Sequence, residues 1–193
     1  MYAIVKDGSI TATGTIKQLF PNTSFAGGVA NADFKTAEGV KDIVQGERKD
    51  QKYYYVTQGD VELVDGVPTQ QYTNTAKRLA DEDAKDEDGN QLYVQVWDAD
   101  QNKMVDTSEK LINQGLKTPM TAQVKDTANK LLAPTDWMVI RKYERDVAIP
   151  SATATYRAAV ITECARLETA IADAANVDAL ATVMAGQNWP TNG

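Results

Sequence analysis

The pattern with the clearest chemical meaning lies between Asp98 and Glu109, where oxygen-bearing side chains recur every few residues. Numbered as a twelve-residue calcium loop, the segment has oxygen ligands at positions one, three, five, nine and twelve, and an apolar residue at position eight. The candidate ligands are Asp98, Asp100, Asn102, Asp106 and Glu109. The chemistry that this spacing would support is calcium coordination.

Two features of the same segment argue against calcium. Lys103 stands at position six, where a calcium loop needs glycine for its sharp turn, and it adds a positive charge beside the metal. Residues 92–97 alternate in polarity like a strand, whereas a calcium loop follows a helix. We therefore favour a β-hairpin with a polar turn and predict no metal site.

The rest of the sequence contains no residue pattern typical of an active site. The sequence has no histidine, which removes the commonest general base and a common metal ligand. Its one cysteine, Cys164, lies among apolar residues at helical spacing, which is typical of a core position. Gly27-Gly28 lacks the Gly-Lys-Ser/Thr ending of a phosphate-binding loop. We expect no catalytic residue, no cofactor and no enzymatic activity.

The net charge and the distribution of apolar residues argue against two classes of partner, nucleic acids and membranes. The chain of 193 residues has a net charge of −7, so the phosphate backbone of a nucleic acid would be repelled. No run of about 18 apolar residues is present, and the first residues do not resemble a secretion signal. The sequence predicts neither nucleic-acid nor membrane binding, and folding in a cytoplasm.

The first part of the chain has the pattern of antiparallel strands. Asp7-Gly8 predicts a turn between two short strands, and residues 19–25 form an anchored loop. Three further antiparallel strands are predicted at 53–57, 61–64 and 67–72, separated by turns at Gly59-Asp60 and Asp65-Gly66. Alternation would place Tyr53 and Tyr55 on one face and Tyr54 on the other, in packing roles; stacking of sugars or bases is the alternative. Residues 31–44 give no clear pattern.

The second part begins with a short helix-like run at residues 75–80 and an acidic block at 81–90 that we expect to be a solvated loop or a linker. Residues 121–132 and 153–174 have helical periodicity; in the longer segment Val160 and Cys164 belong to the predicted apolar stripe. Asn176 is suited to cap a further helix, and Gly186 to end it in the left-handed conformation.

These elements predict an α+β protein in which N-terminal antiparallel strands and hairpins precede a small C-terminal helical module. We expect a β-rich attachment region at 1–75, an acidic loop with a β-hairpin at 76–115, and the helical module at 116–193. In the module, Trp137 would plug the junction between two helices, and Arg157 would reach Asp136 or Glu144. Alternatively, Trp137, Arg157 and Trp189 form a surface that binds a partner, because Trp and Arg are frequent in interface hot spots.

The C-terminal motifs support one resemblance. The C-terminal part contains, in order, Leu131-Leu132, Thr135-Asp136-Trp137, Arg141, Ile149-Pro150, Tyr156-Arg157 and Trp189-Pro190. This order resembles a family of tailed-bacteriophage tail assembly chaperones and tail-fibre-associated proteins. The first 25 residues are similar to proteins of marine cyanobacterial phages (cyanophages). The resemblance covers about sixty C-terminal and twenty-five N-terminal residues and leaves 31–130 unexplained.

The resemblance implies a non-enzymatic structural protein of the virion, located in the viral tail and made in the host cytoplasm. Its partners would be other phage tail or fibre proteins, with a homo-oligomer as a further possibility. An assembly chaperone that is absent from the mature virion is one alternative. An adhesin-like module that binds the host surface, with calcium at Asp98–Glu109, is another.

Overall fold

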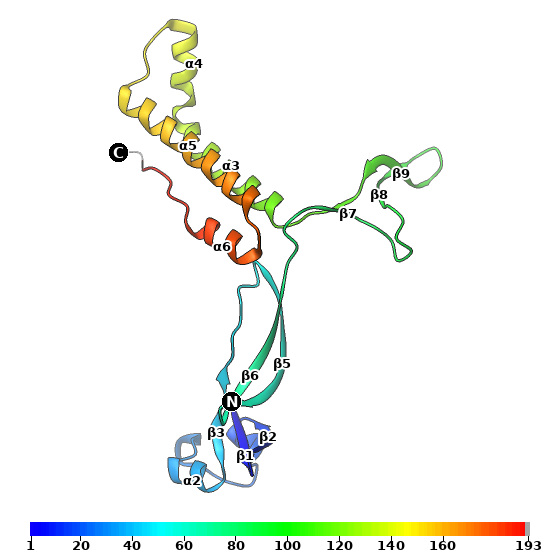
Figure 1. The fold of residues 1–193 in the computed structure, drawn as a ribbon, viewed down its shortest axis with the longest axis vertical. Helices are drawn as coiled ribbons and strands as arrows, with labels where there is room; N and C mark the ends of the chain where they lie inside the picture. The colour runs from blue at the N-terminus through cyan, green and yellow to red at the C-terminus, as the bar shows by residue number, and fades with distance from the viewer. Residues whose placement is uncertain (192–193) are drawn as a thin grey trace. The chain divides into compact units, whose positions relative to one another are not determined.

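The computed structural model describes residues 1–191 and confirms an α+β protein, with 38% of residues in helices and 30% in strands. Its contacts divide the chain into a first unit, Met1–Ala76, and a second unit that begins at Lys77. Figure 1 shows strands and short helices in the first unit, and hairpins and longer helices in the second. Within the described chain, no helix is both long enough and apolar enough to cross a membrane.

The first unit starts with a three-stranded antiparallel sheet. Strand β1 (Tyr2–Lys6) lies between β2 (Ser9–Gly14) and β3 (Val40–Asp42). The predicted hairpin is confirmed, because Asp7 and Gly8 both have the positive φ of a tight two-residue turn, at 50° and 72°.

Phenylalanines anchor the loop that follows this hairpin. Helix α1 (Ile16–Leu19) is capped by Thr15 and α2 (Ala32–Ala37) by Asn31, with the short turn η1 (Ala26–Gly28) between them. The rings of Phe20 and Phe25 meet the ring of Phe34 edge-on, with centroids 5.0 and 4.9 Å apart. The anchored loop is therefore confirmed, and α2 and β3 occupy the segment that the sequence left open.

The strands predicted at 53–57 and 61–64 are a single strand, and the residues predicted to separate them do not form a turn. Residues 54–64 form one strand, β5 (Tyr54–Val64), paired with β6 (Val67–Ala76), which also pairs in parallel with β4 (Val44–Gln45). Gly59-Asp60 is a bulge rather than a turn, because the buried Gln70 side chain donates to the Gly59 carbonyl at 2.6 Å.

The faces predicted for the three tyrosines were wrong for a related reason, whereas the predicted packing role holds for two of them. Because β5 starts only at Tyr54, Tyr53 does not follow the alternation of the strand: Tyr53 and Tyr54 are both buried, while Tyr55 is exposed. The predicted helix-like run at 75–80 was also wrong, because β6 extends to Ala76 and residues 77–80 are not helical.

The acidic block has ordered backbone pairing. Strand β7 (Glu82–Asp83) pairs with β10 (Ile112–Asn113), and Ala84 next to it is buried. A second hairpin, β8 (Tyr93–Asp98) with β9 (Lys103–Lys110), lies between these two strands in the sequence. Most carboxylates of the block remain exposed, and of the acidic residues only Glu82 and Asp83 lie in a strand.

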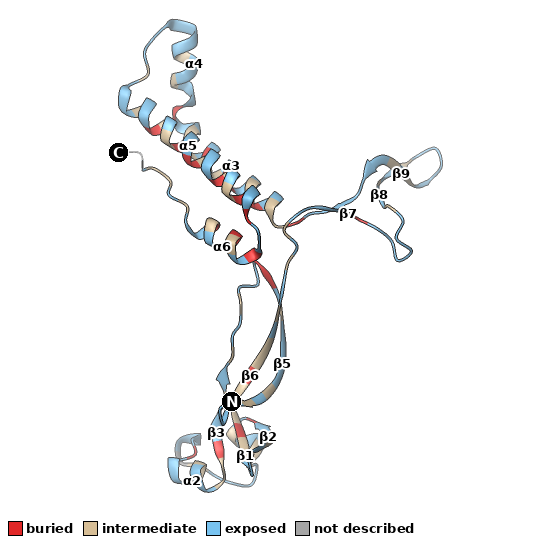
Figure 2. Cartoon of the chain, viewed as in Figure 1, coloured by how far each residue is buried: buried red, intermediate tan, exposed pale blue. Residues whose placement is uncertain are grey.

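The helical module is built around two long helices, α3 (Lys117–Leu132) and α5 (Ser151–Asp173), which pack side by side (Figure 1). A turn, η2 (Ala133–Thr135), leads from α3 into α4 (Asp136–Arg145), and α6 (Val177–Ala185) packs on α5. Figure 2 shows the buried residues as a stripe between the helices. The largest fully buried helical side chains are those of Val124, Val160, Leu167, Ile171 and Leu180.

The helix predictions hold with two differences. The long helix is confirmed, and Asn176 caps α6 by accepting the Ala179 N–H at 2.8 Å. Helix α3 begins four residues earlier than predicted. Gly186 is not left-handed: its φ is −89°, and its N–H stays bonded to the Thr182 and Val183 carbonyls of the last helical turn.

Candidate functional site

The segment considered for calcium forms the β8–β9 hairpin. The Asp98 carboxylate accepts the backbone N–H groups of Gln101 at 3.1 Å and Asp100 at 2.9 Å, and the Gln101 side-chain amide at 2.8 Å. These bonds, that from the Gln101 N–H first, lower the pKa of Asp98. The carboxylate therefore shapes the turn, which is the structure expected of a polar hairpin.

The other calcium candidates are spread along the hairpin. Asn102 has a φ of 51° at the end of the turn, and Asp106 accepts a hydrogen bond from Gln95 across the strands at 2.9 Å. Glu109 lies three residues further along β9, about 10 Å at the rise of an extended strand. Among residues 1–191, no three acidic or cysteine side chains gather as a metal site.

The same hairpin has an exposed apolar surface. Trp97 on β8 lies directly opposite Met104 on β9, and their exposed fractions are 59% and 49%. Val96, exposed to 46%, points to the other face of the ribbon, opposite Val105. A two-stranded ribbon with apolar side chains on both faces buries little by itself, so this surface is suited to contact another protein.

The three residues predicted as a partner surface have different roles. Arg157 is internal: it donates to the Leu132 carbonyl at 2.9 Å and to the Thr135 hydroxyl at 2.6 Å, and its Nη2 lies 2.9 Å from Asp136. Of the two acids considered for Arg157, the structure selects Asp136. Arg157 thus fixes the corner between α3 and α4.

Trp189, and not Trp137, occupies the junction between the helices. Trp189 packs, half-buried, against the cluster of Ala128, Tyr156 and Val160, and its indole N–H donates to Gln187 at 2.8 Å. Trp137 is 52% exposed, so the prediction that it plugs the helix junction was wrong. The C-terminal segment brings Trp189 onto the junction, a contact that sequence neighbours could not reveal. Among residues 1–191, no hydrogen bond, ion pair or ring contact joins Trp137, Arg157 and Trp189 to one another.

Helix α4 is amphipathic yet buries none of its residues. Trp137, Ile140, Arg141 and Glu144 recur at the spacing of one helix face and, with Arg145, line a hollow of about 320 Å³. The Arg141 guanidinium stacks on Trp137, 4.7 Å from the ring centre. Its Nε is shielded from solvent and has no hydrogen-bond acceptor among the described residues.

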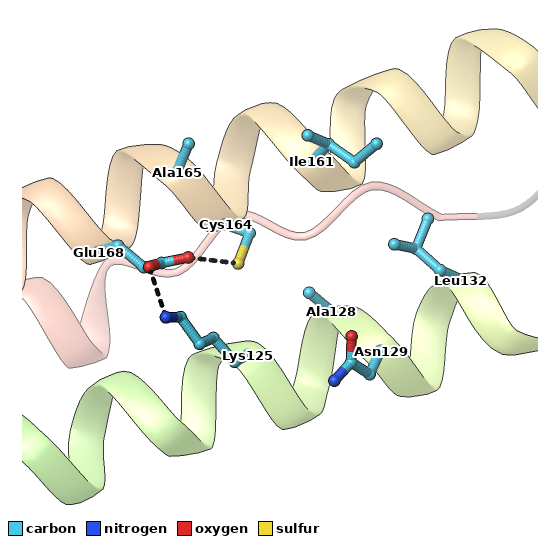
Figure 3. Close-up of a pocket in the computed structure, with 8 residues that line it drawn as sticks. All are labelled: Lys125, Ala128, Asn129, Leu132, Ile161, Cys164, Ala165 and Glu168. Atoms are coloured by element: carbon cyan, nitrogen blue, oxygen red, sulfur yellow. Dashed lines mark hydrogen bonds and ion pairs between the residues drawn. The ribbon is translucent and has the colours of Figure 1, made fainter.

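A second hollow of about 320 Å³ lies between α3 and α5 (Figure 3). Each helix contributes four residues at the same i, i+3, i+4, i+7 spacing. They are Lys125, Ala128, Asn129 and Leu132 of α3, and Ile161, Cys164, Ala165 and Glu168 of α5. Small side chains form the middle of this groove, Leu132 and Ile161 are apolar residues toward one end, and an ion pair of 3.1 Å between Lys125 and Glu168 lies at the other.

The thiol in this groove is poorly suited to nucleophilic catalysis. Cys164 is half-buried, and its Sγ–H donates to the Glu168 carboxylate at 3.3 Å. Burial first, and the adjacent carboxylate second, raise the pKa of Cys164. A thiol in this state stays protonated near neutral pH, whereas attack requires the thiolate.

Sequence reasoning missed Glu163. Glu163 lies in the buried stripe of α5 with 8% of the residue exposed, next to the half-buried Cys164. Glu163 accepts two bonds of 2.7 Å from Arg166 and one of 2.7 Å from the Asn188 N–H. Arg166, three residues later on the same helix, was the available signal, because i, i+3 pairs are neighbours on a helix surface. Glu163 fastens the segment that carries Trp189.

The described residues therefore offer surfaces for contact with other proteins: the β8–β9 ribbon, the exposed face of α4 and the α3–α5 groove. Comparison with protein-family models, with curated proteins and with solved structures gave no match to this chain.

Proposed function

We propose that this chain is a non-enzymatic structural protein of a tailed bacteriophage, associated with the tail or its fibres, where it attaches tail parts to one another. Two observations support the proposal. The C-terminal motifs resemble proteins of phage tails, and the second unit has exposed apolar surfaces of the kind that partners cover.

The exposed Trp97–Met104 pair is the observation that carries the attachment role. Cross-strand contacts between large apolar side chains stabilise a hairpin, but here about half of each side chain remains in water. The outer edges of β8 and β9 are also unpaired with any other described strand, which leaves main-chain groups available to a partner strand. A tail protein placed against this ribbon would cover both.

Quantitative mass spectrometry of purified particles tests the proposed location. A structural component should be present in the virion in a fixed ratio to the other tail proteins. A chaperone that acts only during assembly should be found in infected cells and be absent from the particle. The absence of the protein from both would contradict any role in the tail.

A variant of the ribbon tests the attachment surface. Trp97→Ser should lower incorporation into particles, because it removes an aromatic anchor, while the circular dichroism spectrum of the purified protein stays unchanged. Val147→Ala, between α4 and α5, alters an apolar side chain that is 42% exposed and lies outside both the ribbon and the region 1–75, and it should not affect incorporation. Equal incorporation of both variants would show that attachment uses another surface, such as the region 1–75.

A further inference from the structure

We propose that α4 of one copy of this chain docks into the α3–α5 groove of a second copy. The two surfaces have the same length and spacing. Trp137 to Glu144 on α4 and Ile161 to Glu168 on α5 each cover eight residues, and the first and last are about 10.5 Å apart along the helix. An amphipathic helix that enters a groove uses anchors at i, i+3, i+4 and i+7, which is the spacing on α4.

The chemistry of the two surfaces is complementary along their length. Trp137 and Ile140 lie toward the start of α4, and Arg141 and Glu144 follow. In the groove, the apolar Leu132 and Ile161 lead to the Lys125–Glu168 ion pair. With α4 parallel to α5, the apolar residues meet, Arg141 faces Glu168 and Glu144 faces Lys125. The groove thus supplies a carboxylate to the Arg141 guanidinium, which stacks on Trp137 and makes no ion pair among residues 1–191.

The groove and the helix of one copy are kept apart by Arg157. This side chain binds the Leu132 carbonyl, the Thr135 hydroxyl and Asp136, so the chain leaves α3 in a fixed direction. Helix α4 consequently packs on the η2 turn and buries none of its residues. A second copy can offer its groove to α4, and reciprocal docking forms a closed twofold dimer.

Sedimentation velocity of the full chain at about 50 µM tests the proposal, since micromolar complexes are populated at that concentration. The expected result is a dimer that Ile140→Ala weakens at least about tenfold, as for an interface anchor. Val139→Ala removes an exposed apolar side chain from the opposite face of the same helix and should leave the dimer unchanged.

The groove is tested by Ala165→Arg, which places a large side chain at an exposed position that lines it. Thr162→Arg adds the same side chain at an exposed position of α5 outside the groove lining and is the matched control. Helical circular dichroism and the thermal midpoint check that each variant is folded. We expect Ala165→Arg to separate the copies and Thr162→Arg to leave them associated.

Mixing the two defective variants distinguishes this docking from other dimers. The Ile140→Ala copy keeps an intact groove and the Ala165→Arg copy keeps an intact helix, so the mixture should contain heterodimers and associate more strongly than either variant alone. A monomeric wild type, or a dimer unaffected by Ala165→Arg, would overturn the proposal. In the second case the copies associate through α4 alone or through another face.

Discussion

Arg157 and Asp136 are joined by an ion pair of 2.9 Å at the corner between α3 and α4, and only the arginine is enclosed: the exposed fractions of their side chains are 16% and 56%. The guanidinium also satisfies the Leu132 carbonyl and the Thr135 hydroxyl. The role of Arg157 is therefore to hold a corner of main chain, and the ion pair is its exposed part.

Replacement of Arg157 should consequently cost more than replacement of Asp136. Arg157→Met keeps the apolar stem but removes every donor, and we expect the free energy of unfolding to fall by about 2 kcal/mol. Asp136→Asn alters an exposed ion pair and should cost under about 1 kcal/mol. Urea unfolding monitored by helical circular dichroism measures both, and equal losses would contradict the assigned role of Arg157.

Glu163 should make the stability of the helical module depend on pH. Hydrogen bonding to Arg166 first, and the Asn188 N–H after it, lower the pKa of Glu163 below its ordinary value of 4.5, against the effect of burial. Because the folded pKa is the lower one, this contribution is complete above the pKa of the unfolded chain and is lost as the pH falls through the folded pKa.

The matched variant for this prediction is Glu163→Gln, which keeps the shape but removes the charge. At pH 7 it should lower the free energy of unfolding by about 1.5–3 kcal/mol, the range for hydrogen bonds to charged groups. The difference from wild type should shrink between pH 5 and pH 3, because the unfolded chain takes up a proton at its higher carboxyl pKa while the folded chain resists protonation. Urea midpoints at pH 7, 5 and 3 measure it, and a difference independent of pH would contradict a role for the carboxylate charge.

Gly39 should resist substitution more strongly than Gly27, although both have nearly the same φ, 67° and 68°. A Cβ at Gly39 would lie 2.4 Å from the Val5 carbonyl oxygen, whereas one at Gly27 would meet nothing within 4 Å. Gly27→Ala should cost about 1–2 kcal/mol for the left-handed backbone. Gly39→Ala adds the clash and should increase hydrogen exchange in β1 and β3 well beyond the Gly27 variant; similar exchange in both would argue against it.

The Cys164 thiol should react slowly in the folded protein. Its pKa is raised, chiefly by burial, so less thiolate is present at pH 8 than in an unconstrained cysteine. Alkylation by iodoacetamide, followed by mass spectrometry, should be at least about tenfold slower in the native protein than in guanidinium chloride. Equal rates would show that the groove leaves the thiol open and ionised.

Local signals in the sequence determined several elements of this protein. Asp7-Gly8 fixed a hairpin because two consecutive positive φ angles join strands of natural twist, and Asn176 fixed a helix start because its side chain accepts an N–H three residues later. The apolar spacing of α5 was sufficient to place that helix. Each signal depends on residues within one or two turns of chain.

Tertiary structure decided which residues form a turn and which aromatic side chain enters the core, where the sequence offered more than one candidate. Gly59-Asp60 resembles a turn until Gln70, eleven residues away from Gly59, satisfies the Gly59 carbonyl within a bulged strand. Trp137 and Trp189 are equally suited to a core, and the bond from Asn188 to Glu163 selects Trp189. Periodicity states which face a residue occupies, but the partners that bury it come from distant segments, so the choice depends on contacts that no local pattern contains.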